Sequence, residues 1–129
     1  MSGNSHNGGN PEAKVRKLLV SRQFKQEDTV IKVKDVEIGG ASHVMVAGPC
    51  SIESREQLLT VAKALKDAGV PILRGGAYKP RTSPYDFQGL GLEGLKLMKE
   101  AAKATGLVTV SEIMSPDQIE IAAPYIDIF

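Results

Sequence analysis

Hydrophobic and polar positions follow different patterns in residues 29–38 and in residues 44–47. Residues 29–38 alternate between apolar and polar and are closed by Gly39 and Gly40, which predicts one or two short strands. Residues 44–47 (VMVA) are instead continuously small and apolar, as expected for a parallel strand that is covered on both faces. The pattern therefore changes from a half-exposed ribbon to a buried strand.

Three later segments have apolar residues at helical spacing. The first begins with a capping-box signature, Ser54 with Gln57 three residues later, and ends at Gly69, while the second ends at Gly106. The third has Ser115 as its expected N-cap, with Pro116 as the first helical residue. The expected buried stripes are Leu58, Val61, Ala62 and Leu65 in the first helix, Leu95, Met98 and Ala102 in the second, and Ile119, Ala122 and Ala123 in the third.

Short apolar runs separate these helices. Residues 70–73 and 107–110 read as strands, and residues 126–129 begin another. The alternation of strand and helix predicts an α/β fold with a parallel sheet and right-handed crossovers. This order fits either an open doubly wound sheet or a barrel, and periodicity does not separate the two.

The residues that follow each strand favour the barrel. Barrel chemistry gathers at the carboxyl ends of the strands, and here the strands run into Cys50, into the segment 74–81 and into Glu112. We therefore expect a (β/α)8 barrel of the TIM type, truncated to about its first half. The expected units are a disordered leader at 1–12, an N-terminal extension with short β-strands at 13–42, and the half barrel at 43–129, which ends in its fourth strand.

Composition limits the function without naming it. The 129 residues are 42% hydrophobic and 24% charged, enough for one soluble domain with a core. The formal net charge of +1 gives no general bias toward nucleic acid or membrane, so phosphate binding must come from a local group of cations. The single cysteine, Cys50, and the lack of a signal-like or long apolar segment predict a cytoplasmic setting.

The strongest local signal is the run RGGAYKPRTS at residues 74–83, with three cations and two hydroxyls in a loop that contains glycine. Arginine offers a planar fork to phosphate or carboxylate oxygens, lysine offers a compact charge, and glycine lets the backbone approach an anion. This loop is therefore suited to phosphate. A solvated surface cluster stays open as the alternative.

Two further side chains are candidates for chemistry. Cys50 lies where a strand ends and could supply a thiolate to a divalent metal, although an inert buried thiol is the alternative. Glu112 could orient a water, a cationic side chain or a substrate, with a surface carboxylate as the alternative. His6 and His43 lack the spacing of a paired metal site, and we interpret both as structural or incidental.

Three motifs together carry a family resemblance: VAGPCSIE at 46–53, LRGGAYKPRTSPY at 73–85 and FQGLG at 87–91. This combination resembles the 3-deoxy-D-arabino-heptulosonate-7-phosphate (DAHP) synthases of the type I beta-like subfamily, over residues 18–129. The resemblance implies condensation of phosphoenolpyruvate with erythrose 4-phosphate, which releases phosphate. This reaction opens the shikimate pathway to aromatic amino acids. It also implies a divalent metal of the Mn, Fe, Co or Zn type.

Roles for single residues follow from their positions in these motifs. Cys50 would be a metal ligand, and Lys79 would hold phosphoenolpyruvate and act as the catalytic proton donor. The other implied substrate-binding residues are Arg74 and Glu112 near phosphoenolpyruvate, Arg81 and Thr82 for the aldose phosphate, and Pro80 between the two groups.

The chain also departs from the family. A full barrel needs eight strand-helix units in about 250 residues, and the other family metal ligands, a His, a Glu and an Asp, match no residue here. We therefore expect the isolated chain to be inactive and, because of its open strand edge, to self-associate as a homo-oligomer.

Two alternatives stay open at this point. One is a non-catalytic half barrel or anion-binding assembly module. The other is 3-deoxy-manno-octulosonate-8-phosphate synthase, which the contiguous run KPRT at 79–82 makes less suitable, since that branch typically carries an Ala-Asn step between lysine and arginine.

Overall fold

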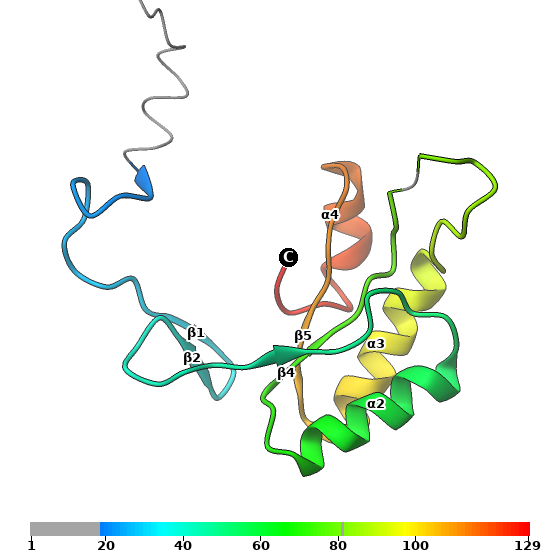
Figure 1. Cartoon of the computed structure of the whole chain (residues 1–129), viewed down its shortest axis with the longest axis horizontal. Helices are drawn as coiled ribbons and strands as arrows, with labels where there is room; N and C mark the ends of the chain where they lie inside the picture. The colour runs from blue at the N-terminus through cyan, green and yellow to red at the C-terminus, as the bar shows by residue number, and fades with distance from the viewer. Residues whose placement is uncertain (1–18, 81) are drawn as a thin grey trace, which may run out of the picture.

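The computed structural model of the chain describes residues 19–80 and 82–129. The expected leader at 1–12 and the candidate Arg81 lie outside these residues. Within the described ranges, no helix has both the length and the apolar character needed to cross a membrane. The elements in chain order are β1 (Ile31–Val33), β2 (Val36–Ile38), β3 (Val46–Ala47), α2 (Arg55–Asp67), β4 (Ile72–Arg74), α3 (Leu92–Thr105), β5 (Val108–Val110) and α4 (Asp117–Ala122) (Figure 1).

The N-terminal strands form a hairpin beside the main unit. β1 pairs with β2 in antiparallel register, with Ile31 opposite Ile38 and Val33 opposite Val36. The connecting turn contains Lys34, a non-glycine residue at φ 51°. The prediction of one or two short strands in this segment is confirmed, and the hairpin lies to one side of the parallel sheet (Figure 1).

The second sheet is parallel, with its strands in the order β3-β4-β5. An isolated parallel bridge between Val110 and Ile128 continues this order at the predicted fourth strand. Strands that follow one another in the chain are thus neighbours in space. The α/β class with a parallel sheet is confirmed.

The three helices share one hydrophobic core against this sheet. Leu73 of β4 is fully buried in a cluster with Leu58 of α2, Met98 of α3 and Ala122 of α4. Because side chains alternate along a strand, the neighbours of Leu73 face the other side. The described helices therefore cover a single face of the sheet.

The exposure of β3 corrects one prediction. The run 44–47 was expected to be covered on both faces, but Met45 is 51% exposed and Val46 is 48% exposed. Val46 stands opposite Ile72 in the register, on the face away from the helices. Ile72 on that same face is only 1% exposed, so the exposure follows from the position of β3 at the edge of the described sheet.

The predicted caps of the two long helices are confirmed. The Ser54 side chain accepts a hydrogen bond from the backbone N–H of Gln57 at 3.1 Å, and Gln57 Oε1 accepts one from the backbone N–H of Glu53 at 3.0 Å. At the other end Gly69 has φ 75°, and Gly106 ends α3 at φ 78° with its N–H bonded to the carbonyl of Ala102. These glycines reach a left-handed conformation that is strained for other residues.

The predictions for α4 were partly wrong. The helix begins at Asp117 with Pro116 as its N-cap, because the N–H groups of Gln118 and Ile119 bond three residues back in a tighter turn. Ala122 is fully buried, but Ile119 is 44% exposed and Ala123 is also exposed. Ile119 instead lines an apolar hollow of about 350 Å³, so this six-residue helix contributes little to the core.

One carboxylate ties the hairpin to the parallel sheet. Asp127 Oδ2 accepts hydrogen bonds from Thr109 N–H at 2.9 Å and Thr109 Oγ1 at 3.0 Å, and pairs with Lys34 Nζ at 2.7 Å. Burial raises the pKa of Asp127, but the hydrogen bonds from Lys34 and Thr109 lower it by a larger amount. The pKa of Asp127 therefore lies below its ordinary value. The hairpin turn, β5 and the start of the fourth strand therefore meet at one charged group.

Candidate active site

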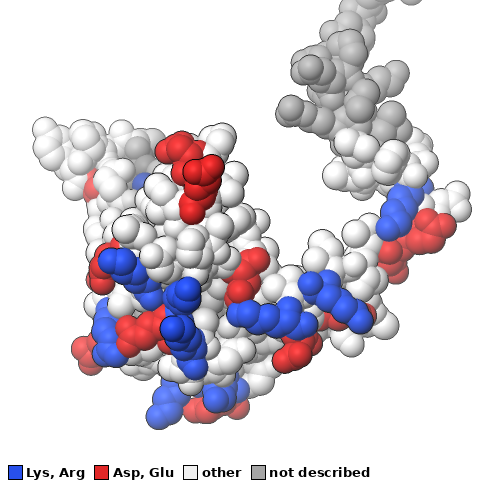
Figure 2. Space-filling model, turned by 180° about the vertical axis from the view of Figure 1, so that it is seen from behind, with Lys and Arg blue, Asp and Glu red and all other residues white. Residues whose placement is uncertain are grey.

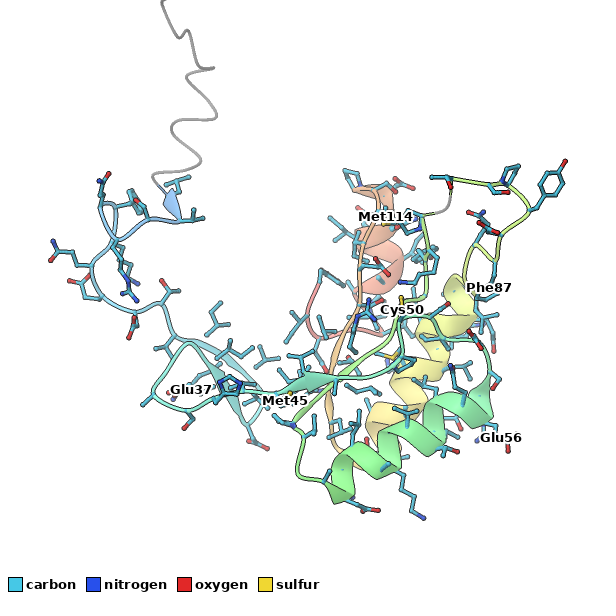
Figure 3. The ribbon with its side chains drawn as sticks, viewed as in Figure 1. Glu37, Met45, Cys50, Glu56, Phe87 and Met114 are labelled. Carbon is cyan, nitrogen blue, oxygen red and sulfur yellow. The ribbon has the colours of Figure 1, made fainter. Side chains whose placement is uncertain are left out.

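The end of β4 is linked to the segment that follows β3. Arg74, the last residue of β4, donates a hydrogen bond from Nη1 to the carbonyl oxygen of Pro49 at 3.1 Å. Cys50, which follows Pro49 in the chain, has an exposed thiol. Cys50 lies within the parallel unit, well away from the hairpin residue Glu37 (Figure 3). The guanidinium of Arg74 and the thiol therefore occupy the same end of the sheet.

A buried ammonium group lies beside them. Lys79 is 8% exposed, and its Nζ forms an ion pair and hydrogen bond with Oε1 of Glu112, which follows β5. A lysine is rarely this buried unless an opposite charge compensates the loss of water. The pair therefore joins the loop after β4 to the loop after β5.

Gly76 marks the point where all three strand ends meet. A Cβ atom at Gly76 would lie 2.4 Å from the carbonyl oxygen of Cys50, 2.7 Å from Lys79 Nζ and 2.8 Å from Glu112 Oε1. The structure thus brings Cys50, Arg74, Lys79 and Glu112 together, as expected from the ends of adjacent parallel strands. We call these four residues the strand-end cluster.

The cluster changes the acidity of the thiol. Hydrogen bonds with Arg74 and then Lys79, together with the positive charges of both, lower the pKa of Cys50 below the ordinary value of a thiol. Cations favour the thiolate because they stabilise its charge. At neutral pH, the exposed Cys50 is therefore a better nucleophile and a better metal ligand than an isolated cysteine.

This shift predicts a pH profile for Cys50 in the metal-free chain. We expect alkylation by iodoacetamide to rise with pH through a midpoint below that of a free thiol, because the rate follows the thiolate fraction. Arg74→Met should move the midpoint to higher pH, since it removes the largest stabilising contact. The check is the alkylation rate against pH by mass spectrometry, with exposed Lys63→Met as control. An unchanged midpoint in Arg74→Met would contradict the assignment.

The rest of the predicted anion loop projects away from the cluster. Pro80 and Thr82 are exposed, and Tyr85 is 96% exposed. The base of the loop is closed by hydrogen bonds from Lys79 N–H to the carbonyl of Gln88 at 2.9 Å and from Gly91 N–H to that of Ala77 at 2.8 Å. Figure 3 shows Phe87 at the outer side of the molecule. The structure therefore does not bring Pro80 or Thr82 into the cluster.

On the face seen from behind (Figure 2), the charges of the described residues do not gather into a patch of one sign. Basic and acidic side chains are interspersed over most of the face seen from behind (Figure 2), in line with the net charge of +1. Attraction of an anion therefore depends on the local strand-end cluster.

The described residues do not complete a metal centre. No group of three or more His, Cys, Asp or Glu side chains within 19–80 and 82–129 could hold a metal ion. The Cys50 thiolate is a suitable donor, but one thiolate falls short of the three or four protein ligands of typical transition-metal sites. The donor set described here therefore does not by itself fit the divalent metal that the family resemblance implied.

Three features of the site were missed by the sequence analysis. Gly76 was interpreted only as a residue that lets the backbone approach an anion, although a pair of glycines directly after a strand also signals close approach of other protein atoms. The hydroxyls of Ser51 and Ser111 are buried and have no hydrogen-bond partner among the described residues. Ser51 directly follows Cys50 in the chain, and Ser111 directly precedes Glu112. The unsatisfied hydroxyls therefore belong to residues adjacent to the cluster.

Comparison with known proteins identifies relatives along most of the chain. A model of the DAHP synthetase I family matches residues 20–129. The phospho-2-dehydro-3-deoxyheptonate aldolase of Thermotoga maritima is 53% identical over 110 residues, covering 85% of this chain and 32% of the relative. The 2-dehydro-3-deoxyphosphooctonate aldolase of Koribacter versatilis is 34% identical over 104 residues, covering 75% of this chain and 37% of the relative.

Solved structures agree with these relatives. The crystal structure of the Thermotoga maritima phospho-2-dehydro-3-deoxyheptonate aldolase matches with a TM-score of 0.78 and 51% identity, covering 85% of this chain and 32% of that one. A truncated form of 3-deoxy-D-arabino-heptulosonate 7-phosphate synthase from Thermotoga maritima matches with a TM-score of 0.71 and 47% identity, covering 85% and 39%. The chain therefore spans about a third of the length of the proteins that it matches.

Proposed function

Because this chain belongs to the DAHP synthetase I family, we propose that it supplies the phosphoenolpyruvate end of a site that condenses phosphoenolpyruvate with erythrose 4-phosphate. The products are 3-deoxy-D-arabino-heptulosonate 7-phosphate and phosphate, at the entry to the shikimate pathway. The observation that carries this proposal is the buried Lys79–Glu112 pair beside Arg74 and Cys50 at the ends of three adjacent strands.

The cluster has the chemistry that phosphoenolpyruvate requires. This donor carries a phosphate and a carboxylate, so it needs at least two cationic partners a short distance apart. Arg74 can offer its planar fork and Lys79 its point charge. Glu112 holds the ammonium in place, and Lys79 is the group proposed to give a proton to the aldehyde oxygen as the new carbon–carbon bond forms.

The acceptor and the metal are assigned to other parts of the site. The phosphate of erythrose 4-phosphate is proposed to bind at Arg81 and Thr82. In the chain, Pro80 separates these two residues from Lys79. Cys50 is proposed as one ligand of a divalent cation of the Mn, Fe, Co or Zn type. Its lowered pKa supports this role, since metals bind the thiolate.

We also propose that the sheet is part of a (β/α)8 barrel. Its strands follow one another without reversal, and its helices share one core on one face. A doubly wound sheet would instead place helices on both faces. Residues 43–129 would then be the first half of the barrel, and residues 13–42 would be its extension. The open strand edge supports self-association as a further expectation. The single cysteine supports a cytoplasmic setting.

The related octulosonate reaction has weaker support. Identity to the 2-dehydro-3-deoxyphosphooctonate aldolase of Koribacter versatilis is 34%, against 53% to the heptonate enzyme of Thermotoga maritima. The contiguous KPRT run at 79–82 points the same way. A non-catalytic half barrel that only binds anions is the alternative that the experiment below addresses.

Titration calorimetry with phosphoenolpyruvate tests the proposal on this chain. We expect phosphoenolpyruvate to bind more tightly than inorganic phosphate at equal ionic strength, because Arg74 and Lys79 can engage two anionic groups rather than one. The preference should persist when salt is raised, since Lys79 is buried from screening ions. Equal affinity for the two anions, lost together in salt, would favour the non-catalytic alternative.

A further inference from the structure

We propose that Gly76 is a positioning residue of the strand-end cluster. In this inference, which takes its catalytic meaning from the proposed function, the missing side chain of Gly76 allows Lys79 and Glu112 to meet against the carbonyl of Cys50. Any side chain at this position would separate the ammonium from the carboxylate. Residue 76 would thereby decide whether the three strand ends act as one site.

The three nearest contacts around Gly76 all come from the strand-end cluster. An added Cβ would meet the Cys50 carbonyl oxygen at 2.4 Å, Lys79 Nζ at 2.7 Å and Glu112 Oε1 at 2.8 Å, all closer than real Cβ atoms approach. Gly76 is not among the glycines with positive φ. Its backbone would therefore accept alanine, and the three nearest obstacles to a methyl group all belong to the cluster.

The neighbouring Gly75 provides a contrast within the same two residues. A Cβ at Gly75 would lie 2.6 Å from Sδ of Met98 and 3.1 Å from Cγ1 of Ile52, which are both buried in the core. Successive residues of an extended chain face opposite sides. Gly75 is therefore required by the packing of the helices, and Gly76 by the cluster on the other side.

The least restrained groups around Gly76 are the two charged side chains. The Cys50 segment is held by the hydrogen bond from Ile52 N–H to the Gly76 carbonyl at 3.0 Å and by Arg74 on the Pro49 carbonyl. Lys79 Nζ and Glu112 Oε1 are instead the ends of rotatable side chains. A methyl group at residue 76 should therefore push these ends apart and expose the ammonium to water.

Gly76→Ala and its matched control Gly75→Ala test the proposal in this chain. The first measurement is the ¹⁵N-resolved signal of the Lys79 ammonium, whose protons should exchange slowly because the side chain is paired and only 6% exposed. We expect the signal to be lost in Gly76→Ala and kept in Gly75→Ala. The second measurement is phosphoenolpyruvate affinity, which should fall roughly tenfold or more in Gly76→Ala, as expected when a charge-assisted contact is lost.

The outcomes separate this inference from the proposed function. A protected ammonium in Gly76→Ala, or an equal loss in both variants, would overturn the role of Gly76. If the parent chain does not bind phosphoenolpyruvate, the proposed function fails, while the ammonium signal still decides the inference.

A double variant covers the case in which Gly76→Ala does not fold. Gly76→Ala combined with Glu112→Ala removes one of the atoms that the methyl group would meet. Gly76→Ala should therefore destabilise the Glu112→Ala background less than it destabilises the parent chain. Equal destabilisation in both backgrounds, or failure of both variants to fold, would overturn the proposal.

Discussion

Lys79→Met is expected to abolish phosphoenolpyruvate binding by this chain and turnover by an assembled synthase. Methionine keeps most of the apolar stem in a position that is 8% exposed, but it removes the ammonium and leaves Glu112 without its partner. Loss of a charge-assisted contact to the anion costs about 1.5–3 kcal/mol, or roughly a ten- to hundredfold loss of affinity, and the unpaired carboxylate separately destabilises the fold. Calorimetry and kcat/KM measure the effect, with Lys63→Met on the exposed side of α2 as control. Full turnover in Lys79→Met would rule out its catalytic role.

A second variant separates lost binding from lost stability in this experiment. Lys79→Met with Glu112→Gln removes the uncompensated carboxylate, so its melting temperature should recover toward that of the parent chain. Phosphoenolpyruvate affinity should not recover, because the cation is still missing. Recovery of both quantities would mean that Lys79 acts on the fold and not on the ligand.

Gly48→Ala is expected to unfold the parallel unit. A Cβ at Gly48 would lie 1.9 Å from the carbonyl oxygen of Arg74 and 2.9 Å from its carbon, and Gly48 has φ 149°. Both obstacles are backbone atoms at the end of β4, so the clash can be relieved only by separating β3 from β4. We expect a loss of about 4 kcal/mol or more in the free energy of unfolding, measured by denaturant titration.

Gly69→Ala is the matched control for this prediction. Gly69 also has positive φ, at 75°, but nothing lies within 4 Å of its added Cβ. Alanine there should cost only about 1–2 kcal/mol, for the left-handed conformation itself. If Gly48→Ala destabilises the chain no more than Gly69→Ala does, the close approach of β3 and β4 is not essential.

Local signals were sufficient for most of the secondary structure. Ser54, Gly69 and Gly106 act on backbone groups within a few residues, so their capping roles could be read from the sequence and are confirmed. The exposure of Val46 and Ile119 could not be read in this way. It depends on the position of β3 at the edge of the described sheet and on how short α4 is, and both are consequences of tertiary packing.

The candidate site shows the same division. The order of strands placed Cys50, the cationic loop and Glu112 at one edge, because parallel strands end on the same side. The pairing of Lys79 with Glu112, 33 residues away, has no local signature. The glycine pair after β4 signals a close approach, but which groups approach Gly76 is known only once the three strand ends are assembled around it. The catalytic and ligand roles of these residues stay predictions until the variants above are measured.

The closed base of the loop after Lys79 has an evolutionary consequence. Because the bonds at Gln88 and Gly91 hold its two ends, changes in length or composition between residues 80 and 87 need not disturb the ammonium behind them. If the proposed function holds, recognition of the first substrate and choice of the second could therefore diversify independently. On that proposal, a lineage could exchange one sugar for another by remodelling a few surface residues while the groups that bind the donor stay intact.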